Sequence, residues 1–408
     1  MMGRSRALRL RAIAQNLGLL LGGLLIAVAA GELLIRYAAP QPIYRFPPGL
    51  YVEDAVLKYR LAPDFLGPAT TGEYHTQIRT NSHGLREDKE YSMPKPPGTF
   101  RILAVGDSFT MGVGVELAQT WVKVLERSLA GGGSPVKYEV INAGVPGYDT
   151  SQEVAYVSND GSNLDPDLVL LGFFVGNDVN DNYRKPDEVV IRGYLMEGEP
   201  RGGILSADAR IFLQRNFHLY HFLYGYWHGL LHPETEGYMK AKRDFFLSIF
   251  AAQDNAQTAA MWEATWQQLR QLKRLVQERG WTVAVVIMPD HLQVDARAWQ
   301  QIEELQSPGR SYRVDAPDQK MIQRCAELGL PALDLLPVFQ GADRSSEMYF
   351  KVDGHWTAQG NALAAAAISD YLRKQALIVG AKSVPADTQV RTSGMAGDDW
   401  RSRGRKAP

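Results

Sequence analysis

Three side chains in the sequence are of the types that nucleophilic catalysis needs. Ser108 ends the segment Gly106-Asp107-Ser108, and Asp353 and His355 stand two residues apart near the end of the chain. A serine hydroxyl is a poor nucleophile and needs an adjacent base. His355 can take the proton and later return it, and Asp353 can orient the imidazole and stabilise its charged form. These residue types therefore point to acyl transfer with Ser108 as the nucleophile.

The same chemistry needs hydrogen-bond donors for the negative oxygen that develops during acyl transfer. Two further segments can supply such donors, 142–148 with its small residues and Gly176-Asn177-Asp178. We expect the backbone N–H groups of Ser108 and Gly147 and the side-chain amide of Asn177 to form an oxyanion hole.

Buried strands alternating with helices must position these residues. Short apolar runs predict five strands, at 101–105, 138–141, 168–174, 282–288 and 332–335. Apolar residues at three- and four-residue steps predict helices between them, at 116–130, 150–160, 262–279, 315–328 and 357–374. This alternation is typical of a parallel sheet with helices on both faces. In such folds ligands bind beyond the carboxyl ends of the strands, where Ser108, Gly147 and Asn177 are expected.

Taken together, these segments resemble the SGNH (GDSL-type) hydrolase superfamily. Gly106-Asp107-Ser108 matches its nucleophile block, Asn142 to Gly147 its glycine block, and Gly176-Asn177-Asp178 its asparagine block. The resemblance covers 99–183 and 262–375. It implies a three-layer α/β/α flavodoxin-like domain with a parallel five-stranded sheet, and esterase, lipase or acyl-transfer activity. It also implies a triad of Ser108, Asp353 and His355, with Ser108, Gly147 and Asn177 in the oxyanion hole.

The last block departs from the usual superfamily pattern. That pattern is Asp-x-x-His, whereas Asp353 precedes His355 by two positions and Val352 stands where the usual aspartate would be. The short Asp-x-His-Trp spacing is similar to the alginate O-acetyltransferase-like branch, which favours acetyl transfer over hydrolysis. The run from Asn81 to Arg86 and the apolar N-terminus resemble membrane-anchored bacterial members.

The N-terminus predicts a membrane anchor. Residues 1–15 carry four arginines and no acid, and 16–31 carry no charge. As a helix, 16–37 would be about 33 Å long, enough for a hydrocarbon core of about 30 Å. We expect a cytoplasmic tail at 1–15, a transmembrane helix at 16–37 in the bacterial inner (plasma) membrane, and a catalytic domain on the periplasmic or extracellular side. The competing interpretation is a signal peptide cleaved at Ala27-Val28-Ala29.

Composition excludes several classes of protein. Lys and Arg total 44 against 45 Asp and Glu, so the net charge of −1 argues against a nucleic-acid partner. The single cysteine, Cys325, cannot form an intrachain disulfide or a multi-cysteine metal site. The first strand leads to Gly-Asp-Ser, without the glycine-rich signatures of dehydrogenases or P-loop NTPases. We expect neither a metal nor an organic cofactor.

Three segments lie outside the expected catalytic domain. We expect a partly ordered connector at 38–98, a mainly helical insertion or cap at 184–261, and a disordered tail at 376–408. The insertion is rich in aromatic residues, and four of its histidines would share one stripe of an unbroken helix. Such a stripe could bind zinc or form a polar face near the cleft or the membrane. No Asp or Glu belongs to the stripe, which favours the polar face. The stripe consists of His218, His221, His228 and His232.

The sequence thus predicts an anchored serine esterase acting on an ester or O-acyl group at the cell envelope. Its substrate would be an O-acylated glycan or a small ester, and the sequence does not identify its protein partners. One alternative is an O-acetyltransferase of an envelope polysaccharide, in which a sugar hydroxyl replaces water. Another is a catalytically inactive scaffold or glycan-binding protein, which only the short spacing between Asp353 and His355 supports.

Overall fold

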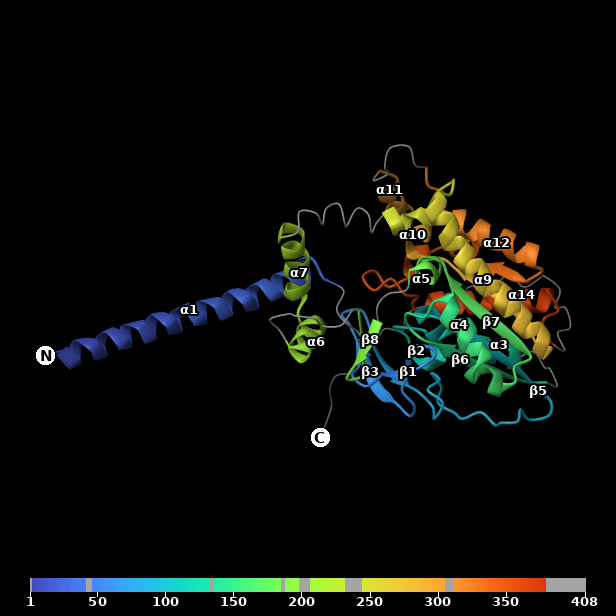
Figure 1. The fold of residues 1–408 in the computed structure, drawn as a ribbon, viewed down its shortest axis with the longest axis horizontal. Helices are drawn as coiled ribbons and strands as arrows, with labels where there is room; N and C mark the ends of the chain where they lie inside the picture. Colours follow the sequence, from blue (N-terminus) through green and yellow to red (C-terminus); the bar gives the residue numbers. More distant parts are fainter. Residues whose placement is uncertain are drawn as a thin grey trace, which may run out of the picture.

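A parallel sheet forms the centre of the protein (Figure 1). A computed structural model describes residues 2–41, 46–131, 136–184, 188–197, 206–231, 244–304 and 311–378. Five strands make up the sheet: β5 (Thr99–Gly106), β6 (Lys137–Gly144), β7 (Leu168–Phe174), β10 (Thr282–Met288) and β11 (Ala332–Asp334). Their order is β11-β10-β7-β5-β6, and all neighbours pair in parallel. The predicted five-stranded parallel sheet is therefore confirmed, and the strand order is the flavodoxin-like one, with its switch point between β5 and β7.

Helices cover both faces of this sheet. One face carries α4 (Thr150–Ser158), α5 (Asp178–Tyr183), α9 (Ala256–Arg279) and α12 (Ala316–Leu328). The other carries α3 (Trp121–Ala130), α13 (Leu336–Gln340) and α14 (Ala358–Lys374). Side chains alternate along β5, so that Leu103 packs into the first layer and Ile102 into the second. This arrangement confirms the expected three-layer α/β/α domain.

The first helix, α1 (Met2–Ala38), extends away from this domain (Figure 1). Its stretch Leu10–Ala38 is long and apolar enough to cross a membrane, and little of it is buried against the rest of the protein. This is consistent with a single-pass anchor or a signal segment.

The segment expected to be a connector is folded. It contains two antiparallel hairpins, made by β1 (Tyr51–Asp54) with β2 (Lys58–Leu61) and by β3 (Leu66–Thr70) with β4 (His75–Arg79). Their buried side chains pack onto the loops that follow β5 and β6, where Met111, Val145 and Tyr148 lie. We call residues 46–98 the extension. It covers the carboxyl edge of the sheet, whereas the sequence predicts a partly ordered connector.

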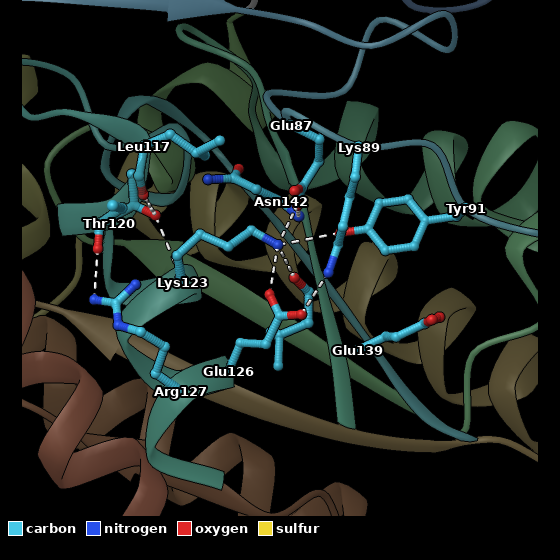
Figure 2. Close-up of polar contacts among 12 residues, drawn as sticks. Glu87, Lys89, Tyr91, Leu117, Thr120, Lys123, Glu126, Arg127, Glu139 and Asn142 are labelled. Carbon is cyan, nitrogen blue, oxygen red and sulfur yellow. Dashed lines mark hydrogen bonds and ion pairs between the residues drawn. The ribbon is translucent and has the colours of Figure 1, made fainter. Parts of the chain in front are cut away.

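Buried ion pairs attach the end of the extension to the domain (Figure 2). Lys123 of α3 lies 2.7 Å from both Glu87 and Glu126, and it donates hydrogen bonds to Tyr91 and to the Val140 carbonyl. Glu87 also accepts the backbone N–H of Asn142 in β6 at 2.8 Å. The extension is therefore bonded to a helix and to a strand of the main domain.

The insertion, which the sequence predicts to be mainly helical, contains a short hairpin as well as helices where the structure describes it. It begins with the hairpin of β8 (Glu188–Ile191) and β9 (Tyr194–Glu197), and helices α6 (Ala207–Asn216) and α7 (His218–Leu231) follow. The hairpin packs on the extension, where the Tyr51 N–H donates to the Gly193 carbonyl at 3.2 Å. Leu247, Ile249 and Phe250 are buried in the main core, because the domain resumes before α9.

The described residues also include the short helices α2 (Ser108–Met111), α10 (His291–Val294) and α11 (Ala296–Glu304). The predicted disordered tail at 376–408 falls outside the described residues from 379 onward.

Candidate active site

Ser108 begins helix α2 directly after β5. Asp107 caps this helix, because its Oδ1 accepts the backbone N–H of Phe109 at 2.8 Å. Helix α2 lies so close to β6 that a Cβ on Gly144 would stand 2.1 Å from the Met111 nitrogen. Arg86 of the extension donates to the carbonyls of Met111, Gly112 and Val115 at 2.5–2.7 Å, which holds the far end of α2. The nucleophile candidate therefore sits on a tightly held turn at the switch point of the sheet.

The structure brings Ser108, His355 and Asp353 into one chain of hydrogen bonds. The distance from Ser108 Oγ to His355 Nε2 is 2.7 Å, and that from His355 Nδ1 to Asp353 Oδ1 is 2.5 Å. Gly354, between them, has φ +78°, a conformation that glycine adopts most readily. This tight turn lets Asp353 reach the imidazole across a single intervening residue. The short spacing is thus compatible with the geometry of a Ser-His-Asp triad.

Two residues of the extension hold the turn that carries Asp353. The Tyr74 hydroxyl donates to Asp353 Oδ2 at 2.9 Å. The Glu73 carboxylate accepts three consecutive backbone N–H groups, those of Lys351, Val352 and Asp353, at 2.8–3.1 Å. Sequence reasoning missed Glu73 and Tyr74 because about 280 positions separate them from this turn. The sequence from Tyr74 to Thr80 has some strand character, which predicts a strand there but no contact with Asp353.

Aromatic side chains support the imidazole. The His355 ring lies 4.9 Å from the ring of Phe109, which in turn contacts Phe174 at 4.2 Å and Trp356 at 5.1 Å. Trp356 is buried and stacks on Phe339 of α13 at 4.9 Å. The tryptophan after His355 therefore packs beneath the turn.

The loops that carry Gly147 and Asn177 meet at the same edge of the sheet. Asn177 Nδ2 donates to the Tyr148 carbonyl at 3.3 Å, which links the loop after β7 to the loop after β6. Gly147 has φ +83°, and a Cβ there would stand 2.7 Å from the Tyr59 hydroxyl and 3.3 Å from Glu188 Oε1. Both the extension and the insertion thus border Gly147. The oxyanion roles of Ser108, Gly147 and Asn177 stay predictions.

Buried carboxyl groups lie behind the nucleophile candidate. Burial raises the pKa of Asp107 to about 7. Burial also raises the pKa values of Glu153 and Asp178 well above the ordinary range, and nearby carboxylates reinforce both shifts. Asp178 accepts the Phe174 N–H at 2.6 Å and the Thr150 hydroxyl at 3.2 Å, which fixes the loop that bears Asn177.

The end of β10 adds a second histidine that the sequence prediction did not include. His291 Nδ1 is 3.1 Å from Asp290 Oδ1, and this hydrogen bond raises the pKa of His291. The same nitrogen stands 3.7 Å from where a Cβ on Gly354 would lie. Ligands in such folds bind beyond the carboxyl ends of the strands, and His291 follows the end of β10. Its position in the sequence could therefore have marked it as a candidate.

The histidine stripe does not converge on one point where the structure describes it. His218 Nδ1 accepts the Gln41 N–H at 2.9 Å, and His221 Nε2 lies 2.9 Å from the Gln214 carbonyl. His232 and the side chain of His228 are outside the described residues. Among the described residues, no group of three or more His, Cys, Asp or Glu side chains is arranged to hold a metal.

Comparison with known families supports the resemblance read from the sequence. Residues 245–398 match a family described as the SGNH hydrolase-like domain of the acetyltransferase AlgX. This range includes Asp353 and His355 but not Ser108. The resemblance to the SGNH superfamily is thereby confirmed.

Among the solved structures that match the chain, three are matched over nearly their whole length. They are TesA (14% identity, 67% of this chain and 98% of that chain, TM-score 0.37), a lipase/acylhydrolase from Enterococcus faecalis (18%, 70% and 100%, 0.36) and the acetyl xylan esterase AlAXEase (12%, 68% and 100%, 0.37). No curated protein sequence matches the chain.

Proposed function

We propose that the protein is a serine esterase of the SGNH type that acts on an ester or O-acyl group at the cell envelope. One observation carries the proposal, namely the hydrogen-bond chain of 2.7 Å and 2.5 Å from Ser108 through His355 to Asp353. In the same proposal α1 anchors the protein in the bacterial plasma membrane, with the catalytic domain outside. The substrate class is an O-acylated glycan or a small ester.

The first half of the reaction forms an acyl-serine. Ser108 Oγ attacks the ester carbonyl while His355 Nε2 takes the hydroxyl proton, and Asp353 stabilises the resulting imidazolium. The N–H groups of Ser108 and Gly147 and the amide of Asn177 would bind the negative oxygen. Collapse of this intermediate breaks the bond to the alcohol oxygen, and His355 gives that oxygen its proton. The free alcohol leaves and the acyl group stays on Ser108.

The second half transfers the acyl group to an acceptor. His355 takes a proton from the acceptor hydroxyl as its oxygen attacks the acyl-serine, and Ser108 regains the proton when it leaves. Water as acceptor gives hydrolysis, and a sugar hydroxyl gives O-acetyl transfer. The short Asp-x-His turn and the match to the acetyltransferase AlgX family favour transfer as the second candidate.

The test of the proposal is Ser108→Ala assayed on a panel of p-nitrophenyl esters beginning with the acetate. We expect turnover to fall by about six orders of magnitude, because loss of a triad nucleophile removes the whole covalent route. Ser311→Ala makes the same change at an exposed serine and should leave turnover intact. Unchanged turnover in the Ser108 variant would exclude the mechanism. Labelling of Ser108 by a fluorophosphonate would exclude the inactive scaffold.

Hydrolysis and transfer are separated by product analysis. The protein is incubated with an acetyl donor and an oligosaccharide acceptor, and both acetate and acetylated oligosaccharide are measured. Acetate alone identifies an esterase, whereas an acetylated oligosaccharide that requires Ser108 identifies a transferase.

A further inference from the structure

Helix α7 is short, uncharged and aromatic. Its 14 residues, His218–Leu231, include no Asp, Glu, Lys or Arg, and five of them are Tyr, Phe or Trp. At about 1.5 Å per residue the helix is about 21 Å long, which is too short to cross a hydrocarbon core of about 30 Å. The composition is therefore apolar enough for lipid contact, but the length excludes a second membrane span.

Large apolar side chains of α7 point outward. Phe222, Leu223, Tyr224 and Tyr226 have exposed fractions between 40% and 60%. Phe212 of the neighbouring helix α6 is also exposed. Phe222 and Tyr226 lie about one turn apart on one side of α7 and Tyr224 lies on the opposite side, so large apolar side chains are exposed around the helix. Exposed apolar surface of this kind marks the helix as a contact element.

The start of α7 is docked onto the outer end of α1. The Glu32 carboxylate accepts the N–H groups of His218 at 3.2 Å and Leu219 at 2.8 Å. Arg36 pairs with Glu32 at 2.7 Å and donates to the Asn216 carbonyl at 2.8 Å. These contacts give partners to the one acidic residue that interrupts the apolar stretch of α1.

The two helices cross. Figure 1 shows α7 running across the direction of α1, and the two helices are in contact. Gly31 allows the close approach, since a Cβ there would stand 3.3 Å from Leu219 Cδ2. If α1 spans a bilayer, α7 lies parallel to the bilayer surface at the depth of Glu32, near the outer end of the span.

We propose that α7 is an interfacial helix, embedded along the outer surface of the membrane that α1 crosses. This inference rests on the proposed anchoring. Tyrosine and tryptophan favour the headgroup region, where their rings contact acyl chains and their polar atoms stay hydrated. Phe222 and Tyr226 on one side of α7 and Tyr224 on the other enter this region together, because the helix is embedded in it.

The position of α7 has a consequence for the candidate site. Arg215, at the end of α6, donates to the Tyr194 hydroxyl of β9 at 3.2 Å and to the Phe46 carbonyl at 2.9 Å. The partner strand β8 carries Glu188, which borders Gly147. Contact of α7 with lipid would therefore orient the domain relative to the membrane through the insertion hairpin.

Lipid-borne quenchers test the proposal in the full-length protein. In a Cys325→Ala background, single cysteines replace Leu25, Tyr224 or Val56, and each is labelled with an environment-sensitive fluorophore. Leu25 lies inside the apolar stretch, and Val56 is an exposed residue on the extension. The protein is placed in vesicles of phosphatidylethanolamine and phosphatidylglycerol that carry a spin-label quencher either near the headgroup or deep in the acyl chain.

We expect the Leu25 label to lose most of its emission with the deep quencher, the Tyr224 label with the shallow quencher, and the Val56 label with neither. A label at Tyr226→Cys should repeat the Tyr224 result. If Leu25 is quenched while Tyr224 behaves like Val56, the interfacial helix is excluded and the anchor stands. If Leu25 is not quenched, both ideas fail. Protection of Tyr224 from aqueous iodide without lipid quenching would identify a protein as the occupant and overturn the proposal.

Discussion

Asp353 is held from two directions at the residue scale. One carboxylate oxygen faces His355 and the other accepts from Tyr74, while Glu73 binds the backbone on the N-terminal side of the turn. A carboxylate with both oxygens engaged cannot rotate away from the imidazole. Tyr74 and Glu73 thus act as positioning residues for the proposed triad.

Tyr74→Phe should weaken catalysis without weakening substrate binding. A hydrogen bond to a charged group contributes about 1.5–3 kcal/mol, so we expect kcat to fall by about tenfold or more while KM changes little. Without the Tyr74 hydroxyl the Asp353 carboxylate can rotate away from His355. Steady-state measurement of kcat and KM checks this split. Tyr371→Phe on α14 makes the same change elsewhere, and an equal loss in both variants would contradict the positioning role.

Gly354→Ala should disable the turn between Asp353 and His355. The residue has φ +78°, where a side chain costs about 1–2 kcal/mol, and a distorted turn would break the contact with Ser108. Gly98, at φ +74° with open space around its Cβ position, provides a matched control. Gly98→Ala should lower the thermal midpoint by a similar amount and keep its activity. Equal activity in the two variants would show that the turn has no catalytic importance.

Asp107 should make the stability of the protein fall as pH rises. Its pKa in the fold is about 7, whereas an unfolded aspartate titrates near about 4. Between these values the folded state keeps a proton that the unfolded state has lost, so the contribution of Asp107 is full below pH ~4 and is lost as pH approaches ~7. Asp107→Asn keeps an oxygen for the Phe109 N–H. It should make the slope of unfolding free energy against pH less negative, by at most about 1.4 kcal/mol per pH unit.

Urea unfolding at several pH values across that interval measures the slope. Asp343→Asn, at an exposed position, should leave the slope as it is in the parent protein. An Asp107 variant with the parent slope would show that this carboxyl group does not hold its proton in the fold.

At the element scale, the central strands and helices are predictable and the extension is not. The strands of the sheet are buried on both faces, so each appears in the sequence as an unbroken apolar run such as 168–174. The hairpin strands have four or five residues and bury only every second one, as in β3 and β4. Such short alternations are hard to distinguish from loops. Whether residues 46–98 fold onto the domain depends on contacts with Met111 and Tyr148, which lie further along the chain.

The residues of the candidate site also fall into a group that the sequence predicts and a group that it does not. Ser108, Asn177 and His355 can be read from the sequence because each belongs to a local motif. The residues that hold the turn, Glu73 and Tyr74, belong to no motif, and only tertiary structure brings them there.

The ion pair between the extension and α3 should be important for stability. Lys123→Met leaves the Glu87 carboxylate buried without its cation, which typically costs about 3–5 kcal/mol. Adding Glu87→Gln removes the uncompensated charge and keeps an acceptor for the Asn142 N–H, so the double variant should regain part of the loss. Chemical denaturation measures both.

Lys137→Met provides the control for this pair. The Lys137 side chain is mostly exposed although it pairs with Glu139, so its loss should cost about 0–1 kcal/mol. A cost as small as this for Lys123→Met would mean that the extension is not held by this contact.

At the scale of the whole molecule, three parts follow one another in space from the N-terminus. The apolar helix α1 comes first, helix α7 crosses the C-terminal end of α1, and the α/β/α domain with its extension lies beyond (Figure 1). The extension connects to the anchor in sequence and to the candidate triad in space. The proposed anchor and the residues that hold the turn of the candidate triad are therefore close together in the sequence.

Under the proposed function, the contact between Tyr74 and Asp353 has a consequence for when activity would arise during synthesis. The two residues are 279 positions apart, and Ser108 and His355 are 247 apart. Contacts of such long sequence separation form late in folding, because a large loop must close first. A growing chain would carry its serine without a base until residue 355 has been added. If the protein is exported and catalyses acyl transfer as proposed, it would stay inert during synthesis and export and gain reactivity only when the fold closes.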